Sequence, residues 1–88
     1  MTKIEVVLTN EAGLHARPAA QFVQKAAGFS SKVTIHSGGK TADAKSILAI
    51  MGLGLGKGSK IELIADGPDE GECLAALRAL VEGNFSEG

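Results

Sequence analysis

Residues 13–28 read GLHARPAAQFVQKAAG, a stretch that predicts a helix starting directly after an exposed turn. Its apolar residues recur at the three- and four-residue spacing of one helix face: Ala19, Phe22, Val23 and Ala26. Proline fits the first helical turn and not the interior, so Pro18 places the helix start at Ala16. A glycine just past the last periodic residue often ends a helix in the left-handed conformation, and we expect this of Gly28.

Alternating apolar and polar residues on both sides of this helix predict strands. The expected strands cover residues 3–8, 32–36, 41–44 and 60–65, and residues 10–13 form a turn after the first strand. Gly38 and Gly39 lie between the second and third strands and favour a tight hairpin turn. The polar alternates that should face water are Lys3, Glu5, Lys32, Thr34, Lys60 and Glu62.

Two further helical segments complete the pattern. Ser46 precedes the apolar residues 47–51 as an N-cap, and Gly52 ends this short segment. Acidic residues followed by apolar residues at helical spacing predict a last helix that begins near Pro68. The order strand, helix, strand, strand, short helix, strand, helix is typical of an α+β fold with helices on one face of a sheet.

Length and composition limit the functions to consider. A chain of 88 residues holds one core, so we expect residues 1–88 to form a single domain. A net charge of -1 at pH 7 disfavours nucleic acid as a partner. The single cysteine, Cys73, rules out an intrachain disulfide and is expected to pack in the core, and no Cys/His cluster suggests a metal site or another cofactor. The first residues read as a strand, and no apolar stretch spans a bilayer, so we expect a cytoplasmic protein without membrane insertion.

The turn before the first helix carries an imidazole and a guanidinium. A helix start combines unpaired N–H groups with the positive end of the macrodipole, which together favour a phosphate. His15 is therefore expected to be a nucleophile that carries a phosphoryl group, and Arg17 to stabilise that group by charge-assisted hydrogen bonds. Gly13 gives the turn the freedom to present the ring. Because no acid, metal cluster or second base lies nearby in the sequence, a partner protein is expected to complete the site.

Two segments resemble those of the histidine-containing phosphocarrier (HPr) family, and the likeness covers essentially the whole chain. GLHARPAA at residues 13–20 resembles the active-site segment of the family, and KSILAIMGLG at residues 45–54 resembles its regulatory segment. The resemblance implies an open-faced β-sandwich of βαββαβα order, in which three helices cover one face of four antiparallel strands. Gly52 departs from the many family members that carry serine or threonine there.

The resemblance also implies a phosphocarrier protein of the sugar phosphotransferase system, which is not an enzyme. Enzyme I, charged by phosphoenolpyruvate, would phosphorylate Nδ1 of His15, and enzyme IIA domains would receive the group. An HPr kinase/phosphorylase would act on Ser46, which otherwise is a plain N-cap, and a catabolite-control transcriptional regulator is a further expected partner. We expect a monomer whose partner-binding residues are Ala16, Ala20, Gln24, Ala27, Ile47, Leu48, Met51 and Gly54.

Other functions stay open at this point. Within the family, the chain could serve a nitrogen-branch or dihydroxyacetone-kinase phosphotransferase chain, although Ser46 and the segment after it favour the sugar system. A small enzyme could use His15 as a general base. A non-catalytic α+β module could bind a ligand or RNA, but the chain has neither the aromatic residues nor the basic face of an RNA reader.

Overall fold

Four strands with alternating apolar residues form one antiparallel sheet in the order β1-β4-β2-β3. The strands are β1 (Thr2–Val7), β2 (Lys32–Ser37), β3 (Lys40–Asp43) and β4 (Lys60–Asp66). The structure is a computed structural model that describes residues 1–11 and 13–86, so Ala12 of the predicted turn and residues 87–88 of the expected domain lie outside the described residues. Gly38 and Gly39 adopt φ values of 57° and 81°, which confirms the tight hairpin turn between β2 and β3.

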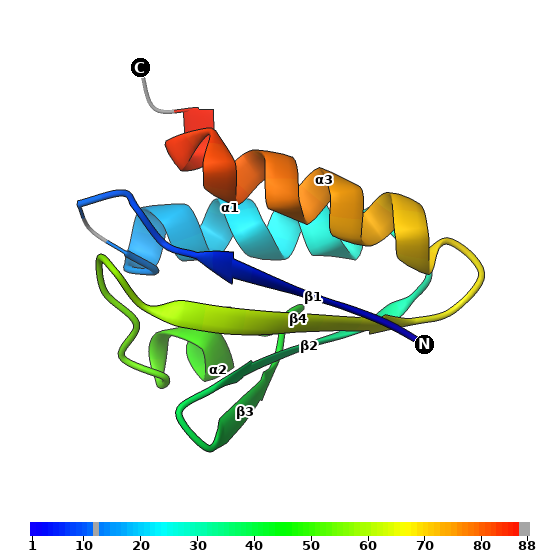
Figure 1. Ribbon diagram of the computed structural model, residues 1–88, viewed down its shortest axis with the longest axis horizontal. Helices are drawn as coiled ribbons and strands as arrows, with labels where there is room; N and C mark the ends of the chain where they lie inside the picture. Colours follow the sequence, from blue (N-terminus) through cyan, green and yellow to red (C-terminus); the bar gives the residue numbers. More distant parts are fainter. Residues whose placement is uncertain (12, 87–88) are drawn as a thin grey trace.

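Helices cover one face of this sheet (Figure 1). The elements are α1 (Ala16–Ala27), α2 (Ile47–Met51), α3 (Glu70–Glu82) and the short 3₁₀ turn η1 (Asn84–Ser86). The long helices α1 and α3 lie side by side, and the short α2 contacts both α1 and β3. This arrangement confirms the predicted α+β fold, with three α-helices and four antiparallel strands in one open sheet.

The core lies between the sheet and the helices. Inward strand positions and the apolar helix faces supply its largest fully buried side chains, among them Phe22, Phe85, Leu8, Ile35, Ile61, Leu63 and Leu77. Burial of this apolar surface is the main force that stabilises the fold. Cys73 is fully buried within the core, as predicted, and burial raises the pKa of its thiol. The predicted polar strand positions lie exposed or half-buried, which leaves the other face of the sheet open to water.

Two local predictions about helix ends were wrong or incomplete. Gly28 does end α1, but with φ -75° it is right-handed, because its N–H turns back to the Lys25 carbonyl at 3.2 Å and tightens the last turn. The sequence did not predict the η1 turn. Asn84 and Phe85 take φ values of 52° and 61° there, and residues with a side chain rarely adopt this left-handed conformation. Phe85 is only 1% exposed, so its burial in the core offsets the unfavourable backbone conformation.

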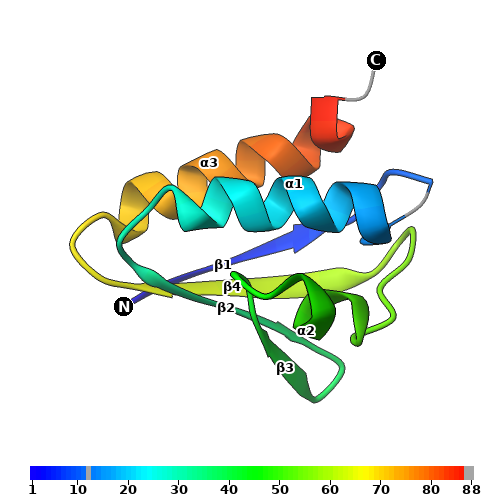
Figure 2. The same ribbon diagram turned by 180° about the vertical axis from the view of Figure 1, so that it is seen from behind.

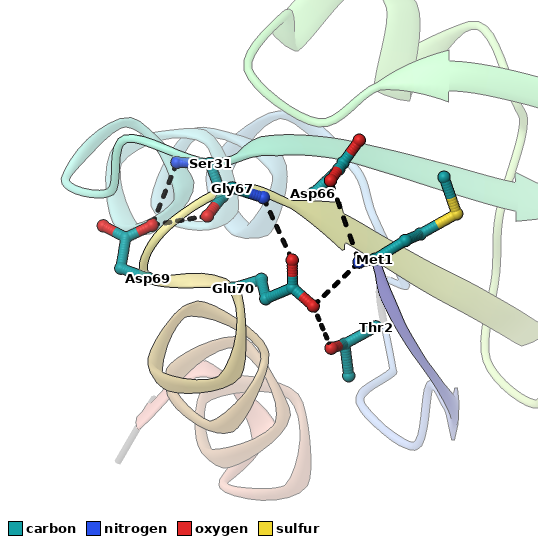
Figure 3. Close-up of polar contacts among 7 residues, drawn as sticks. All are labelled: Met1, Thr2, Ser31, Asp66, Gly67, Asp69 and Glu70. Carbon is teal, nitrogen blue, oxygen red and sulfur yellow. Dashed lines mark hydrogen bonds and ion pairs between the residues drawn. The ribbon is translucent and has the colours of Figure 1, made fainter.

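Hydrogen-bonded carboxylates join the start of α3 to the neighbouring turns (Figure 3). Asp69 accepts bonds from the hydroxyl and the N–H of Ser31, and Glu70 accepts them from the Thr2 hydroxyl and, at 3.1 Å, the Gly67 N–H. The Ser31 hydroxyl is the main group that lowers the pKa of Asp69. The Thr2 hydroxyl is the main group that lowers the pKa of Glu70, to about 2.

We expect the free energy of unfolding to decrease as the pH falls from about 5 to about 2. A carboxyl whose pKa is lower in the folded state binds fewer protons there than in the unfolded chain, so its stabilisation is present above the unfolded pKa and lost as the folded pKa is approached. Urea unfolding followed by circular dichroism, which suits a chain without tryptophan, measures this slope. Glu70→Gln should flatten the slope, because glutamine has no carboxyl group to protonate. An equal slope for Glu70→Gln and the parent chain would contradict the prediction.

Candidate functional site

His15 lies at the N-cap of α1, where the chain turns from the first strand into the helix. Its backbone is extended, with φ -76° and ψ -171°, and its carbonyl accepts the first helical bond from the Ala19 N–H at 2.8 Å. The side chain makes no capping hydrogen bond and is exposed. The backbone of His15 therefore starts the helix while its imidazole points away from the protein core.

The first turn of α1 follows His15 directly in the chain and carries one cationic residue, Arg17. Pro18 lies in this first turn, as expected for a proline at a helix start, and it is buried, whereas Ala16 and Arg17 are exposed. The first turn has no acidic residue that would compete with an anion for the positive end of the helix. A histidine and an arginine thus lie at a helix start that favours a phosphate.

The turn that carries His15 is held by the loop between α2 and β4. The Leu14 N–H donates to the Leu55 carbonyl at 3.1 Å, and the Asn10 side-chain amide donates to the Gly13 carbonyl at 2.8 Å. Gly13 has φ +60°, and a Cβ at this position would lie 2.5 Å from the Gly56 Cα. Glycine is required here for two reasons, because the backbone is left-handed and the neighbouring loop passes directly over it.

Further bonds join the same two loops on the side of β1. The Gly58 N–H donates to the Leu8 carbonyl at 2.6 Å, and the Leu8 N–H donates to the Ser59 carbonyl at 2.9 Å. Lys57 pairs with Glu11 at 3.1 Å across the same gap. Sequence reasoning missed this support, although the glycines that alternate along residues 52–58 could have indicated a backbone in close contact with another segment.

Ser46 lies at the start of α2 and confirms the predicted N-cap. Its hydroxyl accepts a hydrogen bond from the Ala49 N–H at 3.3 Å, and its backbone is extended. The short helix buries Ile50 completely in the core. The Ser46 side chain is half-buried at the molecular surface, next to a helix that contacts α1.

The expected partner-binding residues occupy two adjoining helices and the loop after them. Leu48 and Met51 are 80% and 41% exposed, so α2 presents apolar surface to water. Figure 2 shows α2 beneath the first half of α1, with which it is in contact. The other residues of this set are exposed or half-buried: Ala16, Ala20, Gln24, Ala27, Ile47 and Gly54. These residues lie on α1, on α2 and in the loop after α2, and their role in binding stays a prediction.

The remaining candidate groups do not form a second site of this kind. His36 lies half-exposed on the open face of the sheet, 3.2 Å from a carboxylate oxygen of Glu62. Within residues 1–11 and 13–86, no three His, Cys, Asp or Glu side chains are placed to hold a metal ion. None of the helices described is long and apolar enough to cross a bilayer.

Comparison with known proteins identifies the family. The family described as "PTS HPr component phosphorylation site" matches residues 2–83. The chain belongs to the HPr family. The phosphocarrier protein HPr of Cupriavidus necator is 43% identical over 88 residues, covering 100% of this chain and 99% of that protein.

Solved HPr structures have the same fold. The crystal structure of HPr from Thermoanaerobacter tengcongensis superposes with a TM-score of 0.97 at 44% identity, covering 100% of this chain and 99% of the other. The catabolite-repression protein Crh of Bacillus subtilis, described as a dimer with a swapped domain, gives a TM-score of 0.76 at 43% identity, covering 96% and 97%. The predicted family and fold are confirmed, and the relatives are HPr-type phosphocarriers of the phosphotransferase system and not enzymes.

Proposed function

We propose that His15 accepts a phosphoryl group from phosphorylated enzyme I and passes it to enzyme IIA domains of a sugar phosphotransferase system. The observation that carries this proposal is the exposed ring of His15 at the N-cap of α1, without a capping bond of its own. Family membership supports the assignment, because it is a family of phosphocarriers. The exposed ring and the family membership both support a protein that carries a phosphoryl group.

The step itself is a transfer between two nucleophiles. The lone pair of His15 Nδ1 forms the new N–P bond while the bond from phosphorus to the donor breaks, and the donor retains that electron pair. Arg17 then neutralises charge on the phosphoryl oxygens by hydrogen bonding, and the start of α1 adds its dipole. Transfer to the acceptor repeats the same exchange in the opposite sense, so the chain needs no cofactor of its own.

Partner proteins are proposed to dock over the patch formed by α1 and α2. Leu48 and Met51 supply exposed apolar area close to a cationic helix start, and a carrier needs contacts that release readily. We further propose that residues 1–88 act as one domain in the cytoplasm. Ser46 favours the sugar system over a nitrogen-branch or dihydroxyacetone-kinase chain.

The direct test is intact-mass spectrometry at neutral pH after incubation with phosphoenolpyruvate and purified enzyme I. The expected result is the mass of one added phosphoryl group, which is lost on acid treatment as a phosphohistidine would be. Fragmentation should locate it on His15. No added mass, under conditions that charge a known HPr, would overturn the proposal.

Ser46→Asp is expected to slow the phosphorylation of His15 by enzyme I about tenfold, because a negative charge on α2 would repel an acidic docking face of enzyme I. The measurement is the initial rate of phosphoryl transfer at low ionic strength. Ser46→Asn is the matched control, since asparagine also caps a helix but carries no charge. Equal rates for the two variants would contradict the repulsion, and with it our proposal that an HPr kinase/phosphorylase regulates the carrier through Ser46.

A further inference from the structure

We propose that the outer edge of β1 binds a second copy of this chain, whose own β1 pairs with it in the antiparallel direction. β1 is the terminal strand of the sheet, so within residues 1–11 and 13–86 no strand lies beside its outer edge. Such an edge binds another strand through main-chain hydrogen bonds. Which strand fits depends on the side chains that come to lie opposite each other.

The direction of the backbone groups limits how two copies of β1 can pair. Leu8, just after the strand, directs its N–H and carbonyl toward Ser59 and Gly58 on the β4 side. Because these groups alternate along a strand, the N–H and carbonyl groups of Lys3, Glu5 and Val7 point to the outer edge. A second copy must therefore bring its own odd-numbered positions opposite these residues.

Charge selects one register among those that remain. With Ile4 on the twofold axis, Lys3 of each copy lies opposite Glu5 of the other, which gives two opposite-charge pairs. A shift of the axis to Lys3 or to Glu5 would instead place like charges opposite each other at the centre. The strand is thus self-complementary in a single register.

The same register pairs two exposed apolar side chains. Met1 and Val7 are 82% and 44% exposed on the open face of the sheet. In this register Met1 of one copy lies opposite Val7 of the other, so each side chain covers part of the exposed apolar surface of its neighbour. The pairing therefore gives a partner to the exposed apolar residue just before β1 and to the one at its end, while the outward positions between them are charged.

The carboxylate of Glu5 lacks a cationic partner within the described residues, and the second copy would supply one. It lies directly opposite Glu62 across β1 and β4, which is a like-charge pair. Lys3 lies 3.8 Å from Glu62, but within the described residues no cation pairs with Glu5. Lys3 of the second copy would supply that cation.

The inner side of the strand also has room for the second copy. An open groove of about 230 Å³ runs between β1 and α3, lined by Thr2, Ile4, Gly71, Leu74, Ala75 and Arg78. At the axis, Ile4 would meet Ile4 of the other copy, and the small side chains on α3 leave space for the approach of its α3. Main-chain bonds, charge pairs and apolar contact thus favour the same arrangement.

The dimer should be weak and should leave the proposed carrier site open. One strand edge buries less area than a standard protein interface, so the chain should be a monomer when dilute. β1 and β3 are opposite edges of the sheet, and α2 contacts β3, so the patch on α1 and α2 faces away from β1. Phosphoryl transfer can therefore serve as a test of correct folding in dimer variants.

Sedimentation velocity over a range of protein concentrations tests the proposal with Lys3→Glu and Glu5→Lys. Each variant alone should associate roughly tenfold more weakly than the parent, because both cross-strand pairs become like-charged. An equimolar mixture should associate again, since the two variants place opposite charges at both pairs. The double variant Lys3→Glu/Glu5→Lys should also associate like the parent.

Lys40→Glu and Glu72→Lys are matched controls, because both residues are exposed and the changes of net charge are the same. Each control alone should associate like the parent. A parent chain that stays monomeric at every concentration would overturn the proposal. A dimer whose association is unchanged by the substitutions at Lys3 and Glu5 would also overturn it. A dimer in which the two copies swap their β1 strands would behave in this way, because swapping preserves the contacts of β1 with β4.

Discussion

Replacing His15 by alanine is expected to abolish the added phosphoryl mass after incubation with phosphoenolpyruvate and enzyme I. The imidazole is the nucleophile in the proposed transfer, and alanine has no atom that could form the bond. His15 is exposed, and its side chain makes no capping bond, so its removal should leave the fold intact. The free energy of unfolding of His15→Ala should stay within about 0.5 kcal/mol of the parent value.

His36→Ala is the matched control for this experiment. It removes the second of the two histidines in the chain. This histidine lies on a strand, not at a helix start, and its side chain contacts Glu62. This variant should gain one phosphoryl group at the parent rate. Labelling of His15→Ala, or loss of labelling in His36→Ala, would place the acceptor at a residue other than His15.

Gly13→Ala is expected to lower the free energy of unfolding by more than about 3 kcal/mol. Alanine at φ +60° carries the cost of the left-handed region, about 1–2 kcal/mol. Its Cβ would also lie 2.5 Å from both the Gly56 Cα and the Leu55 carbonyl oxygen, which are backbone atoms that cannot move aside alone. One of the two loops must shift, and the bond from Leu14 to Leu55 should break with it.

Gly54→Ala separates the cost of the left-handed backbone from the cost of the close contact between the two loops. Gly54 has nearly the same φ, +65°, but a Cβ added there would meet no atom within 4 Å. It should therefore lose only about 1–2 kcal/mol, the cost of the backbone conformation. Urea unfolding of both variants gives the difference, which measures the close approach of the two loops. Equal losses would show that the contact at Gly13 is relieved without cost.

Local signals in the sequence were enough to predict most of the fold. Pro18 and the apolar spacing after it gave α1 its correct bounds, and Gly38 and Gly39 predicted the hairpin. Ser46 predicted the start of α2 because a capping hydroxyl acts on the turn that follows it directly. These features depend on neighbours in the chain, and for that reason a single sequence contains them.

The parts that could not be predicted depend on contacts between distant residues. The position of His15 follows from a residue motif, but the loop that holds its turn begins some forty residues later, at Leu53, and no periodicity links the two segments. The left-handed Phe85 is stabilised by burial against the rest of the core, which overrides its local preference. Gly28 ended a helix as predicted, yet its conformation was set by the bonds of the last turn.

The strand order β1-β4-β2-β3 also has a consequence for how the chain acquires its structure. Of the strands described, β1 is made first, but the strand that pairs with it, β4, follows only after residues 8–59, so this pairing must close a long loop. During synthesis, β1 therefore waits without a partner while the β2–β3 hairpin can already form from local contacts. The pairing of β1 with β4 is therefore expected to complete the sheet last, only after all the residues between the two strands have been made.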